Sequence, residues 1–413
     1  MENEFRSKLM IYAHHTNARY VDLLVSLGLS DEFVRAEGAT VYSRNGRSFI
    51  DCIAGYGNLN VGHNHPRVVA SVVNELNSPR PFNWPFISES QIQLVEKLAK
   101  IVPSELSCSF IVNSGTEAVD SALKLVRLAT RKPKVVSFHG AWHGFTMGAL
   151  SVSDPAMCRT LGPLLDQVVH VPFGDVSSAD AATDSETGAL IVEPIQGESG
   201  VIVPSMGYLR ELERICRSKD IVFIVDEIKT GLGKTGRMFA FEYDEVVPDM
   251  IVVGKSLGGG VMPIGALIAK RRLWGKFGLS FPMSSSSAAG NAPACAAALA
   301  TLEVIEKEQL CRNASQLGDD LMTGLVNLVE EYPAIFRKVS GRGLLVGLQA
   351  SNANLSFKLV QGCIQQGVLL MTSFLDRSRI IIEPPLCITK SQIGKVVDAL
   401  RSAADDVMHQ GQV

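Results

Sequence analysis

The stretches Ile221-Val222-Phe223-Ile224-Val225-Asp226-Glu227 and Met250-Ile251-Val252-Val253-Gly254-Lys255 decide the fold of this chain. Each begins with an uninterrupted apolar run, which is typical of a strand buried on both faces of a parallel sheet. Each run leads into an ionisable residue, a carboxylate in one case and an amine in the other. Ligands of open α/β sheets bind at the carboxyl ends of the strands. The two stretches therefore predict a parallel sheet with a site that contains Asp226 and Lys255.

The chemistry of these two residues indicates pyridoxal 5'-phosphate as the cofactor. A desolvated lysine amine can hold this cofactor as a Schiff base, and a carboxylate can keep the pyridine nitrogen protonated so that the ring accepts electrons. A lysine that follows an apolar run and precedes three glycines is also difficult to explain as solvated surface. Lys255 and Asp226 are therefore the predicted catalytic residues.

The pattern of the whole chain predicts an α/β fold with three segments. Residues 1–65 combine a helical start with a hairpin that turns at Asn45-Gly46. Residues 66–300 form the large cofactor-binding α/β domain, because short apolar runs alternate there with helical patterns. Residues 301–413 form a smaller α+β domain with a strand that starts at 341–343, a strand at 379–382 and a final amphipathic helix. The expected strands of the large domain lie at 110–112, 134–138, 168–171, 189–192, 221–225, 250–253 and 265–268.

Composition limits the possible partners. The chain has 413 residues, 46% hydrophobic and 20% charged, with a net charge of -3, so nothing in its charge favours nucleic acid or an acidic membrane surface. The eight cysteines form no CxxC pair and the histidines no HExxH motif, so we expect neither disulfides nor a metal site. The polar start of the chain is unlike a secretory signal, and we expect a cytoplasmic protein.

Phosphate binding is predicted at Ser114, Gly115 and Thr116. These small residues follow an apolar run and open a helical pattern, and the free amides of a helix N-terminus attract a phosphate. Trp142, in the loop after the next strand, could stack on the cofactor ring or be a core aromatic. A P-loop is excluded, because the two GK[ST] sequences at 233–235 and 254–256 lack the earlier glycine of that motif.

With these motifs in order, the chain resembles the class III (ω-amino acid) aminotransferases of fold type I, nearest to the putrescine and ornithine aminotransferase branch. The resemblance implies a mostly parallel seven-stranded sheet in a large domain and a small α+β domain built from both termini. It runs almost end to end and rests on the segments 49–52, 60–63, 113–117, 170–174, 193–198, 226–227, 235–237, 254–255, 258–265, 290–291 and 294–299.

The resemblance also implies roles for individual residues. Lys255 would carry the cofactor and move the proton, Asp226 would face the pyridine nitrogen, Trp142 would stack on the ring, and Gly115 with Thr116 would bind phosphate. Ser286 and Ser287 would reach the phosphate of a neighbouring subunit, which implies a homodimer with shared active sites. The candidate substrate residues are Tyr56, Phe82, Trp84, Glu198, Arg379 and Ile381.

Three departures from the family pattern bear on the substrate. Lys229 stands where a glutamine usually touches the phenolic oxygen of the cofactor, and it could donate there or turn to solvent. Ile381 stands where an arginine usually binds the α-carboxylate of glutamate or 2-oxoglutarate. Arg379, on the same strand face, could restore that charge; otherwise Glu198 would lack its partner and could receive a substrate ammonium. Residues 284–289 lack an aromatic, and Ala288 leaves space there.

These observations predict an aminotransferase that moves an amino group between a primary amine or amino acid and an aldehyde or keto acid, without requiring an α-carboxylate. The alternative is an aminomutase or epimerase with the same lysine and cofactor, which would need no external acceptor. A regulatory protein on the same fold would be expected to lose Lys255 or Asp226, and the chain has both.

Overall fold

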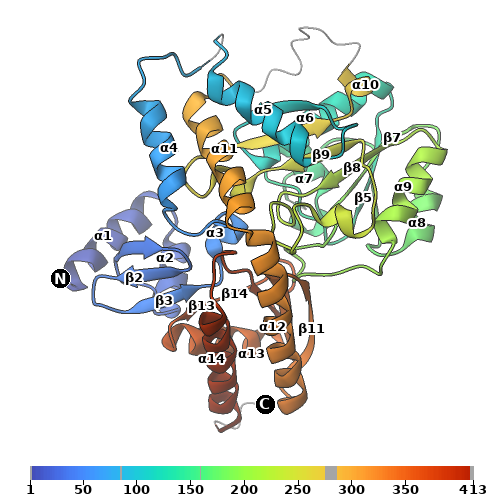
Figure 1. Cartoon of the computed structure of the whole chain (residues 1–413). Helices are drawn as coiled ribbons and strands as arrows, with labels where there is room; N and C mark the ends of the chain where they lie inside the picture. Colours follow the sequence, from blue (N-terminus) through green and yellow to red (C-terminus); the bar gives the residue numbers. More distant parts are fainter. Residues whose placement is uncertain (1, 84–85, 159, 275–285, 410–413) are drawn as a thin grey trace.

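A seven-stranded sheet forms the centre of the larger part of the molecule (Figure 1). The computed structural model describes residues 2–83, 86–158, 160–274 and 286–409. The strand order is β4-β10-β9-β8-β7-β5-β6, with parallel pairing from β6 to β9 and with β10 antiparallel to both of its neighbours. The strands are β4 Cys108–Val112, β5 Lys134–Phe138, β6 Val168–Val171, β7 Thr187–Val192, β8 Val222–Asp226, β9 Met250–Val253 and β10 Gly265–Ala269. The predicted mostly parallel seven-stranded sheet is confirmed.

The central strands are buried on both faces, as their apolar runs predict. Every residue of β7, β8 and β9 is buried. Side chains alternate between two separate cores: Phe223 and Val225 pack into one, and Val222 and Ile224 into the other, which includes helix α6. Because strand side chains alternate with a period of two, Asp226 emerges on the same face as Ile224, where α6 lies. The alternation thus aims the carboxylate toward the start of α6.

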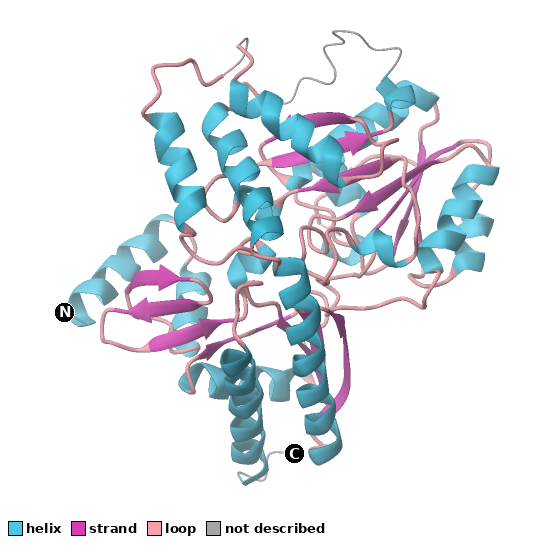
Figure 2. Ribbon diagram, in the orientation of Figure 1, coloured by secondary structure: helices cyan, strands magenta, loops and turns pink. Residues whose placement is uncertain are grey.

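Helices cover this sheet and link it to the lower part of the molecule (Figure 2). Long helix α12 runs from the sheet-containing part toward the C-terminal helices (Figure 1). The α-helices are α1 Glu2–His15, α2 Ala18–Ser26, α3 Ala54–Gly57, α4 Pro66–Leu76, α5 Glu89–Ile101, α6 Gly115–Thr130, α7 Met147–Val152, α8 Val176–Ala182, α9 Tyr208–Ser218, α10 Arg271–Trp274, α11 Ala292–Lys307, α12 Leu310–Glu331, α13 Ala353–Gln365 and α14 Lys390–His409. The 3-10 helices are η1 Pro155–Met157, η2 Ala240–Tyr243 and η3 Lys255–Gly258. No helix in the described ranges is both long and apolar enough to cross a membrane.

Two four-stranded sheets make up the remaining strands, in the orders β1-β2-β3-β13 and β11-β12-β15-β14. The predicted hairpin is present, since β2 and β3 pair antiparallel around residues 44–47. Strand β13, from the C-terminal third, pairs parallel to β3 from the N-terminal segment. The strands are β1 Phe33–Glu37, β2 Thr40–Ser43, β3 Ser48–Asp51, β11 Phe336–Arg342, β12 Leu345–Ala350, β13 Val368–Leu369, β14 Met371–Thr372 and β15 Arg379–Ile382. Segments from both ends of the chain therefore share a sheet, while the domain boundaries at 65 and 300 stay a prediction.

One predicted strand position is wrong. The segment 341–343 does not start a strand but ends β11 and turns into β12. Gly343 has a φ of 57°, in the left-handed region that glycine adopts without steric cost. The sequence pattern marks an irregular backbone at these glycines but does not show whether a strand begins or ends there.

Candidate active site

The start of helix α6 packs closely against the end of β9 and the start of β10. Ser114 caps the helix, its hydroxyl accepting the Glu117 amide at 3.3 Å. A Cβ on Gly254, just after β9, would lie 2.9 Å from the Gly115 Cα, and one on Gly265 would lie 2.4 Å from the Ser114 carbonyl oxygen. Only glycines therefore allow this approach, which brings the first amides of α6 to the edge of the sheet, where they can bind an anion.

Lys255 follows β9 and begins η3 with an unusual backbone. Its φ is 42°, a strained value for a residue other than glycine. Burial lowers the pKa of Lys255 below its ordinary value, and the nearby charge of Lys229 lowers it further. A lowered pKa increases the fraction of neutral amine, the form that attacks a carbonyl.

Asp226 is fixed by two hydrogen bonds. Its Oδ2 lies 2.7 Å from Nδ1 of His143, and its Oδ1 accepts the Ile228 amide at 2.9 Å. Both side chains are buried, and the His143 amide is bonded to Ser153 Oγ at 2.9 Å. The predicted carboxylate thus has a positioning partner, His143, to which the sequence analysis assigns no role. The available signal was its place beside Trp142, in the loop that follows β5.

Glu193 holds the loop that carries Trp142. One carboxylate oxygen accepts the Trp142 amide at 2.7 Å, and the other accepts the Gly197 amide at 3.2 Å. Burial raises the pKa of Glu193 to about 7. Sequence reasoning assigned no role to this residue, which follows β7 and joins two loops at the edge of the sheet.

A cavity of about 180 Å³ brings most of the predicted residues together. Its walls include an amine, a carboxylate, an aromatic ring and the start of a helix. The lining residues are Gly115, Thr116, Trp142, His143, Gly144, Phe145, Glu193, Glu198, Asp226, Ile228, Lys229 and Lys255. These groups fit pyridoxal phosphate. The start of α6 could bind the phosphate, and Asp226 could pair with the pyridine nitrogen. Trp142 could stack on the ring, and Lys255 could bind the carbonyl carbon.

Lys229 is buried in this cavity wall and paired with two carboxylates. Its Nζ lies 2.8 Å from Oε1 of Glu198 and 2.9 Å from Oε1 of Glu383. Although burial lowers the pKa of Lys229, the two carboxylates outweigh it and raise this pKa above the ordinary value. Of the two alternatives for Lys229, the turn to solvent is therefore wrong. Glu198, which has no arginine partner, is paired with Lys229 instead. The sequence interpretation also missed Glu383.

The two residues considered for carboxylate binding lie outside the lining. Ile381 is buried against Ile195, Val201 and Leu345. The Arg379 guanidinium is bonded to Asp376 at 3.1 Å and to Gln349 at 3.0 Å, so its donors point elsewhere in this structure. The proposed restoration of the missing charge by Arg379 is not seen.

The other predicted residues are also outside the lining. Tyr56 stacks on Phe374 with ring centroids 5.6 Å apart. The Phe82 carbonyl accepts the Ala292 amide at 3.0 Å, next to the segment with Ser286 and Ser287, which are both exposed. Trp84 and Ser284 lie outside the described residues.

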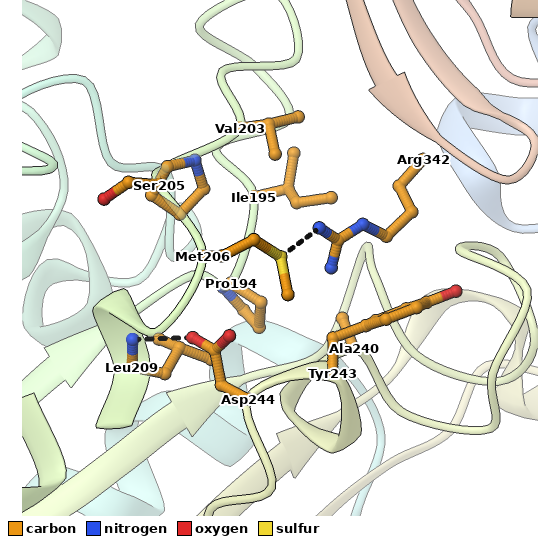
Figure 3. A pocket seen from close by; sticks show the side chains of 11 residues that line it. Pro194, Ile195, Val203, Ser205, Met206, Leu209, Ala240, Tyr243, Asp244 and Arg342 are labelled. Atoms are coloured by element: carbon orange, nitrogen blue, oxygen red, sulfur yellow. Dashed lines mark hydrogen bonds between the residues drawn. The ribbon is translucent and has the colours of Figure 1, made fainter. Parts of the chain in front are cut away.

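A second cavity is lined in part by Pro194 and Ile195, in the loop after β7, and Figure 3 shows its lining. Its polar groups are already bonded: the Asp244 carboxylate accepts the Leu209 amide at 2.8 Å, and the Arg342 guanidinium lies 3.3 Å from the Met206 sulfur. Its volume is only about 20 Å³, about enough for one water molecule. The chemistry of a cofactor site therefore belongs to the cavity with Lys255.

Comparison with known proteins agrees with this geometry. A family model described as aminotransferase class-III matches residues 30–404. The ornithine aminotransferase of Toxoplasma gondii is 30% identical, over 93% of this chain and 92% of its own, with a TM-score of 0.87. An (S)-enantioselective omega-transaminase from Thermomicrobium roseum is 27% identical over 91% and 93%, with a TM-score of 0.85. Acetylornithine aminotransferase from Elizabethkingia anophelis is 25% identical over 94% and 98%, with a TM-score of 0.80. None of these comparisons favours the aminomutase or epimerase alternative.

Proposed function

The chain belongs to the class III aminotransferases, which are pyridoxal-phosphate-dependent enzymes, and on this premise we propose that its amino donor needs no α-carboxylate. The fold is fold type I and the reaction is transamination between a small-molecule amine and a carbonyl acceptor. We propose, in addition, the roles of the site residues, the arrangement of the subunits and the choice of substrate.

We propose the following catalytic roles, which the geometry of the cavity supports. When bound, the cofactor supplies a carbonyl carbon for amines and a ring that accepts electron density from the reacting carbon. Lys255 would provide the amine that holds this carbon. The same amine would then move a proton between the amine-bearing carbon of the substrate and the cofactor carbon. Asp226, oriented by His143, places a negative charge where a protonated ring nitrogen requires one.

The substrate proposal rests on one observation, the absence of a free cation in the cavity wall. Among the residues that line the cavity, all within the described part of the chain, the lysines are Lys229 and Lys255. Lys229 is held by two carboxylates, and Lys255 is needed for the chemistry. A substrate carboxylate would therefore enter without a partner, at a considerable desolvation cost.

The test is the absorbance of the cofactor-loaded enzyme during single-turnover mixing with putrescine, ornithine, alanine and glutamate separately. We expect the amines to bleach the cofactor band and glutamate to leave it nearly unchanged. Rapid bleaching by glutamate would contradict the proposal. The variant Ile381→Arg, which adds a cation beside the loop of Glu198, should improve the use of glutamate.

We also propose a cytoplasmic homodimer with shared active sites. Large apolar side chains lie exposed near the cavity and the predicted contact loop: Phe145 is 78%, Ile87 74% and Phe86 61% exposed. Such exposure supports a protein interface. The exposed Ser286 and Ser287 are available to a second subunit in the same region. The eight free cysteines support a reducing compartment.

A further inference from the structure

The segment Ala54–Gly57, labelled α3, is a turn of left-handed backbone. Its four residues have φ values of 47°, 58°, 60° and 80° in chain order. The Asn58 amide donates to the Ala54 carbonyl at 2.8 Å and closes the turn. Residues with a Cβ usually visit this conformation singly, because the Cβ crowds the carbonyl oxygen that follows. Ala54 and Tyr56 therefore strain the turn, and other groups must hold it in place.

Asp51 and His63 hold the start of this turn. Oδ1 of Asp51 accepts the amides of Ile53 and Ala54, each at 2.9 Å. Its Oδ2 lies 2.8 Å from Nε2 of His63. Because an ionised carboxylate can only accept hydrogen bonds, this nitrogen is the donor. Asp51 is buried, and hydrogen bonds to a charged acceptor are stronger than those between neutral groups. The pair therefore fixes the two amides with which the turn begins.

The other end of the turn lies against the lysine that would hold the cofactor. Helix α3 lies beside η3, which begins at Lys255. A Cβ on Gly57 would lie 4.0 Å from Cδ of Lys255 and 3.0 Å from Oε2 of Glu383. Lys255 itself has a strained φ of 42°. Strained backbone persists only where the surrounding structure holds it. The position of the Lys255 amine therefore depends on a neighbouring turn that is strained as well.

We propose that Asp51 and His63 are positioning residues, which hold the left-handed turn against Lys255 and so place its amine for reaction with the cofactor. Neither side chain is among the described residues that line the cavity, so both act through the turn. In the reaction the neutral amine of Lys255 forms a C=N bond with the carbonyl carbon of pyridoxal phosphate. The carbonyl oxygen leaves as water with the two protons of the amine. This inference rests on the proposed role of Lys255.

The first test measures the attachment of saturating pyridoxal 5'-phosphate to the cofactor-free protein. Borohydride reduction traps the bond at successive times, and peptide mapping identifies the modified lysine. Asp51→Asn and His63→Phe should slow attachment at Lys255 by roughly tenfold or more, since each removes a charge-assisted hydrogen bond. His63→Gln keeps an N–H donor for Asp51 and should react at nearly the wild-type rate. Unchanged rates in Asp51→Asn and His63→Phe would overturn the inference.

A double variant separates backbone strain from the loss of charge. Asp51→Asn also removes a charge near the buried Lys234: burial lowers the pKa of Lys234 to about 8, and the charge of Asp51 acts in the opposite direction. Glycine adopts a positive φ without steric cost. Adding Ala54→Gly to Asp51→Asn should therefore restore much of the lost rate. No restoration would show that Asp51 acts through its charge and not through the turn, which would contradict the inference.

Amide hydrogen exchange of the cofactor-free protein reports on the turn itself. Peptides that span residues 53–59 should exchange faster in Asp51→Asn and His63→Phe than in the wild type and His63→Gln. Peptides from β8 should stay equally protected in all four proteins, which shows that the sheet is intact. Slower attachment with unchanged exchange at 53–59 would refute the role of the turn. Attachment of the cofactor to a lysine other than Lys255 in the wild type would instead refute the proposed role of Lys255.

Discussion

At the scale of single residues, Lys255 is the proposed centre of the chemistry. It follows a fully buried strand, has a strained φ of 42°, and its pKa is lowered by burial and by Lys229. We predict that Lys255→Ala abolishes steady-state transamination, because Lys229, the other lysine in the described lining of the cavity, is held by two carboxylates. Circular dichroism should show an intact fold, and Lys100→Ala, an exposed lysine on α5, serves as the control. Substantial activity of a folded Lys255→Ala enzyme would contradict the assignment.

Glu227 gives a residue-scale prediction about pH and stability. Burial raises the pKa of Glu227 from 4.5 to about 7, although Thr230 and the Phe241 amide partly stabilise the carboxylate. The folded state therefore holds a proton that the unfolded state releases. The contribution of Glu227 to stability is therefore greatest below about pH 4.5, and about 3 kcal/mol of it is lost as the pH rises through about 7.

Glu227→Gln isolates this effect, since glutamine cannot ionise. Melting temperatures of the wild type and the variant should be similar near pH 5, and the wild type should become progressively less stable than the variant up to about pH 8. Parallel melting profiles across this range would show that Glu227 does not titrate as proposed.

At the scale of elements, the contact between the end of β9 and the start of α6 forms the proposed phosphate site. A Cβ on Gly254 would meet the backbone of Gly115 at 2.9 Å, so Gly254→Ala must push the helix start away. Overpacking of this kind costs about 1–3 kcal/mol. We predict at least a roughly tenfold loss of pyridoxal phosphate affinity, measured by titrating the cofactor into the cofactor-free protein. Gly394→Ala in α14, where a Cβ meets nothing within 4 Å, should bind the cofactor normally.

At the scale of the whole molecule, the proposed dimer predicts complementation between two inactive variants. Lys255→Ala removes the catalytic amine, and Ser287→Glu places a negative charge where the neighbour's phosphate is expected. Each homodimer should be inactive or nearly so. Heterodimers should contain one intact site, because Lys255 of one subunit meets Ser287 of the other.

Co-expression of the two variants should therefore restore about a quarter of the wild-type activity, since half of randomly assembled dimers are mixed and each has one working site. Sedimentation should give the mass of two 44.5 kDa chains. No recovery in isolated heterodimers, or a monomer at working concentration, would exclude shared sites.

The positions of the buried strands and of the two proposed catalytic residues could be predicted from the sequence alone. Apolar runs such as 250–253 reflect burial, which depends on local composition, so their positions could be predicted from the pattern alone. Asp226 and Lys255 were recognisable because each stands just where such a run ends. The turn at 341–343 was misplaced, because glycines mark an irregular backbone without saying whether a strand begins or ends there.

The partners of these residues depend on the tertiary fold. His143 and Asp226 are 83 residues apart, and Lys229 and Glu383 are 154 apart. Hydrogen bonds over such separations leave no local pattern, because they depend on how strands and loops meet at one edge of the sheet. Local burial therefore indicated the cofactor, and the resemblance of the motifs to a known family indicated the reaction class. The pairing of Lys229 with two carboxylates, which bears on the choice of substrate, arose only when distant loops came together.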